Sequence, residues 1–199
     1  MSQVIEKKYT HVVTLGPEGT DASTVANLVS EKVIYRNSFP DCMEYALEHD
    51  YLALICVGYV ERKGEVVVDN WVDLNFRYHR KMELIEVFKA ETRPMALAKR
   101  RNCHECNTVV IHPATKEFAS QLVPQAKVSY VNNKPLAVEL VAEGHFDYCI
   151  GSQDVVQQYD SLEITKIIPP PVMIWALYQK AGSTVKKFIF NKYESEVTL

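Results

Sequence analysis

Residues 14–20 read Thr-Leu-Gly-Pro-Glu-Gly-Thr and join an apolar run, His11 to Val13, to a segment with helical periodicity. Two glycines and a proline let a backbone turn sharply between a strand and a helix. The free N–H groups at the helix start then face outward, where the helix dipole favours an anion. The pattern predicts a carboxylate or phosphate cradle, and the alternative is a plain strand-to-helix turn. The residues of the predicted cradle are Gly16, Pro17, Glu18, Gly19 and Thr20.

A second polar turn with a similar arrangement lies at residues 132–135. It reads Asn-Asn-Lys-Pro, follows an apolar run at 127–131 and precedes another helical pattern. Proline suits a first helical turn because its missing N–H would have no partner inside the helix. Asn133 and Lys134 therefore stand at a second helix start, where the lysine adds a full positive charge for an anion. The apolar face expected for this helix carries Leu136, Leu140 and Val141.

Two more strand ends carry polar side chains. His112 follows the strand expected at 108–111. It is a candidate catalytic proton donor or hydrogen-bond partner, because imidazole exchanges protons near neutral pH; the alternative is a histidine bonded to the backbone. Ser152 and Gln153 follow the strand expected at 146–150, and such carboxyl ends bind ligands in open α/β sheets. For Ser152 the alternative is a helix N-cap.

Thr92 and Arg93 belong to a polar segment, residues 91–94, between two apolar strands. An arginine can hold a carboxylate through two parallel hydrogen bonds, so both residues are candidate ligand contacts. The alternative for Arg93 is a solvated surface side chain. We expect residues 91–94 to be a crossing between two lobes. Three successive prolines at 169–171 favour an extended return crossing.

Length and composition fit a globular chain. Its 199 residues are 47% hydrophobic and 24% charged, enough for one large core or two small lobes. A net charge of −3 gives no basic surface for nucleic acid. No run approaches the roughly 18 apolar residues of a membrane span. Without an apolar leader in residues 1–8, we expect a cytoplasmic protein that binds neither nucleic acid nor membranes.

The five cysteines offer no complete metal site. Residues 103–106 form a single Cys-x-x-Cys, and no second pair exists to complete a tetrahedral zinc site with it. We therefore expect loop thiols and no bound metal.

Short β-rich runs alternate with helical patterns, which predicts an α/β fold with mostly parallel sheets. Helices are expected after Thr20, Ser38, Pro113 and Lys134. Strands are expected at 52–57, 66–68, 84–88, 95–98, 108–111, 127–131, 146–150, 162–168 and 173–178.

The order of these motifs resembles that of the prephenate dehydratase family, which carries LGPxGT, then ENS, a His-Pro motif, a Ser-Thr helix start and a terminal Thr-Arg-Phe. Residues 15–20, 110–114 and 142–147 match this order. The resemblance implies a two-lobed fold of the periplasmic binding protein type II kind, each lobe a mixed sheet flanked by helices. It implies one lobe of residues 1–93 with 169–199, and a second of residues 94–168.

Three family motifs are replaced. Residues 58–60 stand at the ENS position, Asn133 and Lys134 at the Ser-Thr pair, and residues 174–178 (Ile-Trp-Ala-Leu-Tyr) at Thr-Arg-Phe. These departures resemble the prephenate decarboxylases of antibiotic pathways, the bacilysin type. Such a resemblance implies a cofactor-free lyase that decarboxylates prephenate without aromatising its ring. The missing threonine is the family's acid for the departing hydroxyl.

Two other functions stay open. The chain could be a prephenate dehydratase whose acid comes from another position, giving phenylpyruvate. It could also be a small-anion binding module that kept the fold and lost catalysis. Under all three hypotheses the partner is a small molecule, with a homodimer as a further expectation.

Overall fold

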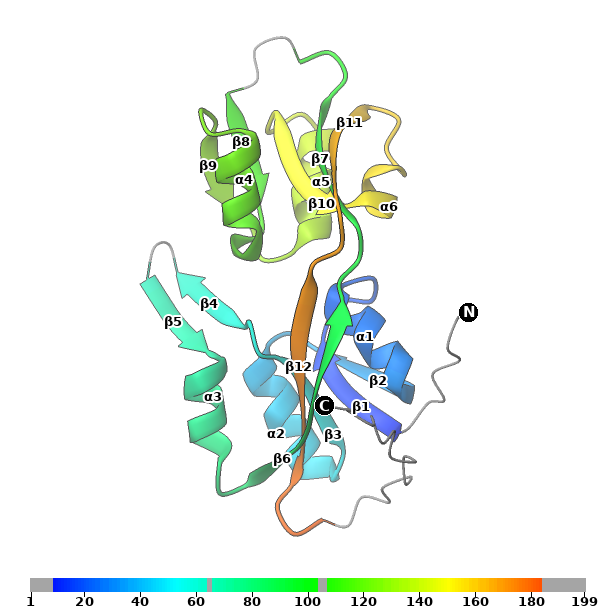
Figure 1. Ribbon diagram of the computed structural model, residues 1–199, viewed down its shortest axis with the longest axis vertical. Helices are drawn as coiled ribbons and strands as arrows, with labels where there is room; N and C mark the ends of the chain where they lie inside the picture. The colour runs from blue at the N-terminus through cyan, green and yellow to red at the C-terminus, as the bar shows by residue number, and fades with distance from the viewer. Residues whose placement is uncertain (1–8, 64–65, 104–106, 184–199) are drawn as a thin grey trace, which may run out of the picture.

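The alternating strands and helices fold into two lobes joined by two extended crossings (Figure 1). Each lobe contains a five-stranded mixed sheet flanked by helices, so the expected fold class is confirmed. The expectation of mostly parallel sheets is wrong, because the crossing strands bring two antiparallel pairings into each sheet. The computed structural model describes residues 9–63, 66–103 and 107–183. We also expect Phe188, Ile189 and Phe190 to pack on the outside of the first lobe or to pair as an added strand, and these positions lie outside the described residues.

The first sheet has the strand order β2-β1-β3-β12-β6. Its first three strands are parallel, and β12 is antiparallel to both of its neighbours. The strands are β1 (Tyr9–Leu15), β2 (Ser30–Arg36), β3 (Leu52–Cys56), β6 (Met82–Glu91) and β12 (Val172–Lys180). The helices of this lobe are α1 (Asp21–Val29), α2 (Phe39–His49) and α3 (Trp71–Tyr78).

Side-chain caps fix where the first two helices begin. The Thr20 hydroxyl accepts the N–H of Ser23, and the Ser38 hydroxyl accepts the N–H of Asp41. Such caps satisfy amide groups that have no partner inside the helix. The expected apolar faces are buried: α1 packs Val25 and its neighbours on one side of the sheet, and α2 covers the other.

The second sheet repeats this design with the order β11-β7-β10-β8-β9. Strands β10, β8 and β9 are parallel, whereas β7 is antiparallel to β10 and β11. The strands are β7 (Met95–Arg100), β8 (Thr108–Ile111), β9 (Lys127–Tyr130), β10 (Tyr148–Ser152) and β11 (Leu162–Ile168). The helices are η1 (Pro113–Thr115), α4 (Lys116–Leu122), α5 (Lys134–Ala142) and α6 (Gln153–Val156).

Helix α5 buries Val141 and packs Leu140 against the core as expected, but Ala137 and Val138 are buried in place of Leu136. Its buried residues are Ala137, Val138 and Val141, whereas Leu136 and Leu140 are less buried. The reason is Gly151 in β10, because a Cβ there would lie only 2.2 Å from a methyl group of Val138. The missing side chain lets the helix lie close against β10 at Val138.

The two crossings run side by side. The first leads from β6 to β7 and the second from β11 to β12, and the N–H of Thr92 donates to the carbonyl of Pro171 at 3.0 Å. We propose the lobe limits on this basis: residues 1–93 with 169–199, and residues 94–168. Their ends at 1–8 and 184–199 fall outside the described residues.

A two-stranded hairpin, β4 (Val60–Lys63) with β5 (Val66–Asn70), extends from the first lobe. Its base is held by Asp69, whose carboxylate pairs with the Arg77 guanidinium of α3 at 3.0 Å. No helix in the described part of the chain combines the length and apolar character that a membrane crossing requires.

Candidate functional site

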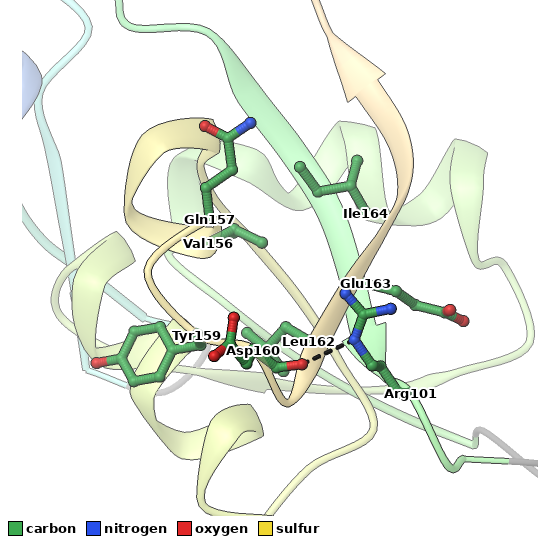
Figure 2. A pocket seen from close by; sticks show the side chains of 8 residues that line it. All are labelled: Arg101, Val156, Gln157, Tyr159, Asp160, Leu162, Glu163 and Ile164. Atoms are coloured by element: carbon green, nitrogen blue, oxygen red, sulfur yellow. Dashed lines mark hydrogen bonds between the residues drawn. The ribbon is translucent and has the colours of Figure 1, made fainter.

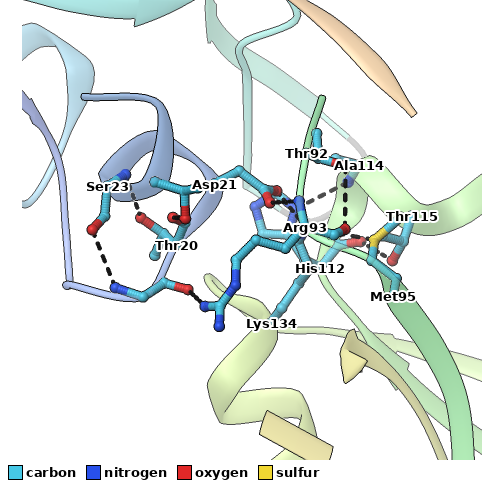
Figure 3. Close-up of polar contacts among 12 residues, drawn as sticks. Thr20, Asp21, Ser23, Thr92, Arg93, Met95, His112, Ala114, Thr115 and Lys134 are labelled. Carbon is cyan, nitrogen blue, oxygen red and sulfur yellow. Dashed lines mark hydrogen bonds and ion pairs between the residues drawn. The ribbon is translucent and has the colours of Figure 1, made fainter. Parts of the chain in front are cut away.

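The N-termini of α1 and α5 meet between the lobes (Figure 3). Asp21 is the first residue of α1, and Lys134 is the first residue of α5. The Lys134 ammonium lies 2.5 Å from an Asp21 carboxylate oxygen, and their side chains are only 15% and 19% exposed. The same ammonium lies 3.5 Å from the sulfur of Met95. The lobes are therefore joined by an ion pair that is mostly shielded from water.

The turn at residues 16–20 uses much of its own hydrogen-bonding capacity. The N–H of Gly16 donates to the backbone carbonyl of Arg36 at 2.9 Å, and the N–H of Gly19 donates to the Ser23 hydroxyl at 3.2 Å. Gly19 has φ +84°, a conformation that glycine adopts without strain. Thr20 is the N-cap of α1. This role agrees with the alternative interpretation of residues 16–20 as a plain strand-to-helix turn. The turn thus offers fewer free donors to an anion than the sequence predicts.

Pro17 and Glu18 complete this turn. The peptide bond before Pro17 is cis, and proline has no N–H to offer a ligand. The Glu18 side chain is exposed. A direct ligand contact by either residue stays a prediction.

Arg93 connects the crossing to both lobes. Its guanidinium donates to the carbonyl of Gly19 in the first lobe and pairs with Asp154, in the first turn of α6. Its backbone N–H donates to an oxygen of Asp21 at 3.0 Å. The alternative of a solvated arginine is wrong, because this side chain is 20% exposed and bound at both ends. Thr92 is also buried, within the crossing itself.

His112 directly follows β8 and caps the short helix η1. Its Nδ1 accepts the N–H of Ala114 at 3.2 Å, so the neutral ring carries its proton on Nε2. Burial and the nearby Lys134 cation lower the pKa of His112 to about 4, although Asp21 partly opposes them. His112 is therefore neutral at pH 7 and suited to donating a hydrogen bond. This state disfavours the expected proton-donor role, because little imidazolium is present.

Three other predicted residues lie at the starts of helices. The Asn133 side chain accepts the N–H of Leu136 at 2.8 Å and caps α5. Ser152 stands at the N-cap position of α6, is 4% exposed, and makes no side-chain capping bond. The N–H of Gln153 donates to the carbonyl of Pro94 at 2.9 Å, which ties the start of α6 to the first crossing.

Sequence reasoning missed three members of this group: Asp21, Asp154 and Cys56. An acidic residue such as Asp21 in the first turn of a helix is accounted for by the helix dipole alone, so nothing in the sequence marks it as a site residue. Cys56 ends β3 and lies close enough to Asp21 and Lys134 for both charges to act on its pKa, which burial raises. The signal that could have found Cys56 is its position, because β3 and β8 both end at this junction and ligand groups gather at such ends.

We call Asp21, Arg93, His112, Lys134 and Asp154 the interlobe cluster, and the charges of this cluster balance. Lys134 and Arg93 supply two positive charges, and Asp21 and Asp154 supply two negative charges. The two cations are thus paired inside the protein, and His112 adds no charge at pH 7. A ligand with two carboxylates must therefore compete with side chains for these cations.

Two surface cavities lie away from the cluster. One of about 260 Å³ is formed by α6 and β11 near the bond between Arg101 and Asp160 (Figure 2). Another of about 560 Å³ is lined by α3, β6 and the turn after β12. Neither contains any of the predicted site residues. The interlobe cluster remains the better candidate, because it brings opposite charges, a histidine and two helix N-termini together.

Cys103 is disulfide-bonded, which corrects the expectation of free loop thiols. Residues 104–106 of the same motif lie outside the described residues. The described part of the chain holds no group of three or more His, Cys, Asp or Glu placed to bind a metal ion.

Comparison with solved structures places the fold. A prephenate dehydratase from Arthrobacter aurescens in complex with L-Phe is 12% identical, with a TM-score of 0.61 over 89% of this chain and 62% of that protein. A Staphylococcus aureus prephenate dehydratase is 11% identical, with a TM-score of 0.53 over 85% of this chain and 67% of that one. A periplasmic transporter is 10% identical, with a TM-score of 0.53 over 88% of this chain and 78% of that one.

These likenesses extend along nearly the whole described chain, at identities that establish the fold alone. The fold is the two-lobed, periplasmic binding protein type II kind. The chain spans less than two thirds of the length of the Arthrobacter dehydratase. No family model and no curated protein matches the sequence.

Proposed function

We propose that this protein binds prephenate between its lobes and decarboxylates it without aromatising the ring or using a cofactor. The observation that supports this most is the meeting of two helix N-termini, with Lys134, Arg93 and His112 beside them. Prephenate carries a ring carboxylate and a pyruvyl carboxylate. Helix N-termini and cations are the groups that bind such anions.

The chemistry separates two possible outcomes. A dehydratase expels carbon dioxide and the ring hydroxyl together, and an acid must protonate the departing oxygen. In a simple decarboxylation the C–C bond to the ring carboxylate breaks, and its electron pair moves into the diene. A proton then adds to a ring carbon, so one proton is consumed, carbon dioxide leaves, and the hydroxyl stays. The product is a dihydro-4-hydroxyphenylpyruvate, which fits secondary metabolism of the bacilysin and anticapsin kind.

The strand that stands at the family's Thr-Arg-Phe position supports the second outcome. In β12, Trp175 and Tyr178 are each 2% exposed and belong to the core of the first lobe. The Tyr178 hydroxyl donates to Asn75 at 3.0 Å. This strand therefore supplies the dehydratase reaction with no hydroxyl acid comparable to the family's threonine.

Each cluster residue then has a role under the proposal. Lys134 and the start of α5 bind one carboxylate, and Arg93 with the turn at Gly19 and Thr20 binds the other. The Nε2–H of His112 donates a hydrogen bond to the substrate, and a single water molecule enclosed at the ring carbon supplies the proton and leaves as hydroxide. Closing the lobes removes water around the ring carboxylate, which favours loss of a neutral molecule from a charged group.

A second candidate is a small-anion binding module. The specific observation in its favour is the internal pairing of both cations, together with a neutral His112, which leaves the cluster without an acid at pH 7. The cytoplasmic location and the homodimer stay predictions under either function.

Product analysis separates the hypotheses. Purified protein is incubated with prephenate at pH 8, alongside a blank without protein and a Lys134→Ala variant. We expect release of carbon dioxide and NMR signals of a non-aromatic ring that retains its hydroxyl. Enzyme-dependent phenylpyruvate, with its aromatic enol absorption, would establish a dehydratase instead. Unchanged prephenate combined with a higher melting temperature would establish the binding module.

A further inference from the structure

Asp21 places a carboxylate where the proposed function needs a ligand carboxylate. One of its oxygens accepts the Lys134 ammonium at 2.5 Å, and the other accepts the backbone N–H of Arg93 at 3.0 Å. It also stands in the first turn of α1, where the helix dipole favours a negative charge. The side chain is thus held by a cation of the second lobe, an amide of the crossing and a helix start of the first lobe.

We propose that Asp21 is a specificity-determining residue that occupies Lys134 in the ligand-free protein and yields it only to a small dicarboxylate. This inference rests on the proposed function, since it concerns the same site. A ligand must displace Asp21 from Lys134 to reach the cation. One carboxylate gains little from that exchange, because one ion pair replaces another. A second carboxylate, held by Arg93 and the opposite helix start, supplies the additional binding free energy.

The same pair also joins the lobes. Asp21 and Lys134 begin helices that pack on different sheets, and their contact is mostly shielded from water. Truncating one partner of such a pair leaves the other charge uncompensated, which costs more than losing a surface ion pair. The pair between Arg93 and Asp154 differs, because the Asp154 side chain is 53% exposed. Asp154 is therefore a suitable control for a second carboxylate of the cluster.

Asp21→Asn is the decisive variant. The amide keeps the shape of the side chain and can still accept the Arg93 N–H, but it removes the charge that holds Lys134. Calorimetry with prephenate, and with the monocarboxylate phenylpyruvate, compares the wild type, Asp21→Asn and Asp154→Asn. We expect Asp21→Asn to bind both ligands at least tenfold more tightly, because both must displace the same carboxylate, so that phenylpyruvate, which the wild type binds too weakly to measure, becomes a detectable ligand. Asp154→Asn should leave phenylpyruvate binding below detection.

A second set of experiments on Asp21→Asn needs no ligand. In low salt, small-angle scattering should give a larger radius of gyration for Asp21→Asn than for the wild type. Alkylation followed by peptide mapping should modify Cys56 faster in the variant, because Cys56 lies close to the pair, while the other described free cysteines, Cys42 and Cys149, are fully buried. Circular dichroism checks that the variant is folded.

The outcomes separate the inference from the function. A folded Asp21→Asn protein with unchanged or weaker affinity for prephenate, and with unchanged scattering and Cys56 reactivity, would overturn the role of Asp21. Tighter binding and more open lobes, without product from the wild type, would support Asp21 while rejecting decarboxylation. Absence of prephenate binding in both proteins would reject the selectivity and the function together.

Discussion

The ammonium of Lys134 acts on the imidazole of His112 at the interlobe end of the second sheet, and together with burial it keeps that ring neutral. Burial is the larger cause of the lowered pKa, and the Lys134 cation adds to it. Lys134 follows β9 and His112 follows β8, and these two strands are parallel neighbours whose carboxyl ends point to the junction. The charge that would attract a ligand therefore also sets the protonation state of the histidine beside it.

This arrangement predicts an acid-dependent loss of stability. The pKa of His112 falls from 6.5 to about 4 on folding, so the unfolded chain takes up this proton first as the pH is lowered. The stabilisation is complete above about pH 6.5, declines between 6.5 and 4, and is fully lost below 4. By linkage it amounts to at most about 3 kcal/mol. Urea unfolding between pH 7.5 and 4.5 measures it.

His112→Asn is the matched control for that measurement. An asparagine oxygen can accept the Ala114 N–H that Nδ1 now accepts, and asparagine is a preferred helix cap. The variant should fold and lose stability less steeply between pH 6.5 and 4.5. Parallel slopes for both proteins, or an NMR titration of the His112 ring with a midpoint near 6.5, would contradict the assigned neutral state.

Lys134→Ala should weaken prephenate binding more than tenfold, on the order of 1.4 kcal/mol or more for a charge-assisted contact. The reason is the loss of the cation at the start of α5, which no other lysine replaces in the interlobe cluster. Lys166→Ala is the control, because Lys166 is exposed on β11 of the same lobe. Equal affinities for both variants, by calorimetry, would remove Lys134 from the ligand site.

Much of the fold could be predicted because its determinants are local. Thr20 and Ser38 cap helices as their positions in sequence indicate, and the crossings follow from a polar segment and three prolines. The apolar runs at 108–111 and 162–168 became strands with those limits. Each of these features depends on backbone preferences or hydrophobic periodicity within a few residues.

The site was harder to predict because its contacts are not local. Asp21 and Lys134 lie 113 positions apart, and no local pattern pairs them. Lys134 was expected to be free for a ligand, whereas folding places the carboxylate of the opposite helix against it. The donors of the first turn were likewise expected to be open, and the side chain of Ser23, one helical turn further on, occupies one of them.

Asp147 should be a major source of stability for the second lobe. Its carboxylate accepts the Thr108 hydroxyl at 2.7 Å and the N–H groups of Asn107 and Thr108 at 3.0 Å each. Burial alone would raise its pKa, but these hydrogen bonds and the Arg100 cation lower the pKa below 3.8. Asp147 therefore stabilises the fold above about pH 4, and this contribution is lost as the pH falls through the lowered pKa.

Asp147→Asn should lower the free energy of unfolding at pH 7 by about 1–3 kcal/mol, because the neutral amide loses the ion pair with Arg100 and weakens the charge-assisted hydrogen bonds from Asn107 and Thr108. The matched control is Asp160→Asn, since Asp160 is an exposed carboxylate of the same lobe. Urea denaturation at pH 7 compares the three proteins. If Asp147→Asn were as stable as the wild type, the link between the starts of β8 and β10 would carry no net stabilisation.

Gly151 should control the position of α5, and with it the position of Lys134. A Cβ at Gly151 would lie 2.2 Å from the nearest methyl group of Val138 and 3.5 Å from one of Val156. Gly151→Ala therefore pushes α5 away from β10 and should destabilise the protein by about 1–3 kcal/mol through overpacking. It should also weaken prephenate binding, because the start of α5 moves relative to Asp21.

The double variant Gly151→Ala with Val138→Ala removes the clashing methyl group and should recover both losses in part. Urea unfolding measures the stability lost in each variant. If the double variant lost more stability than the two single variants lose together, the close approach at Val138 would not be the cause of the destabilisation.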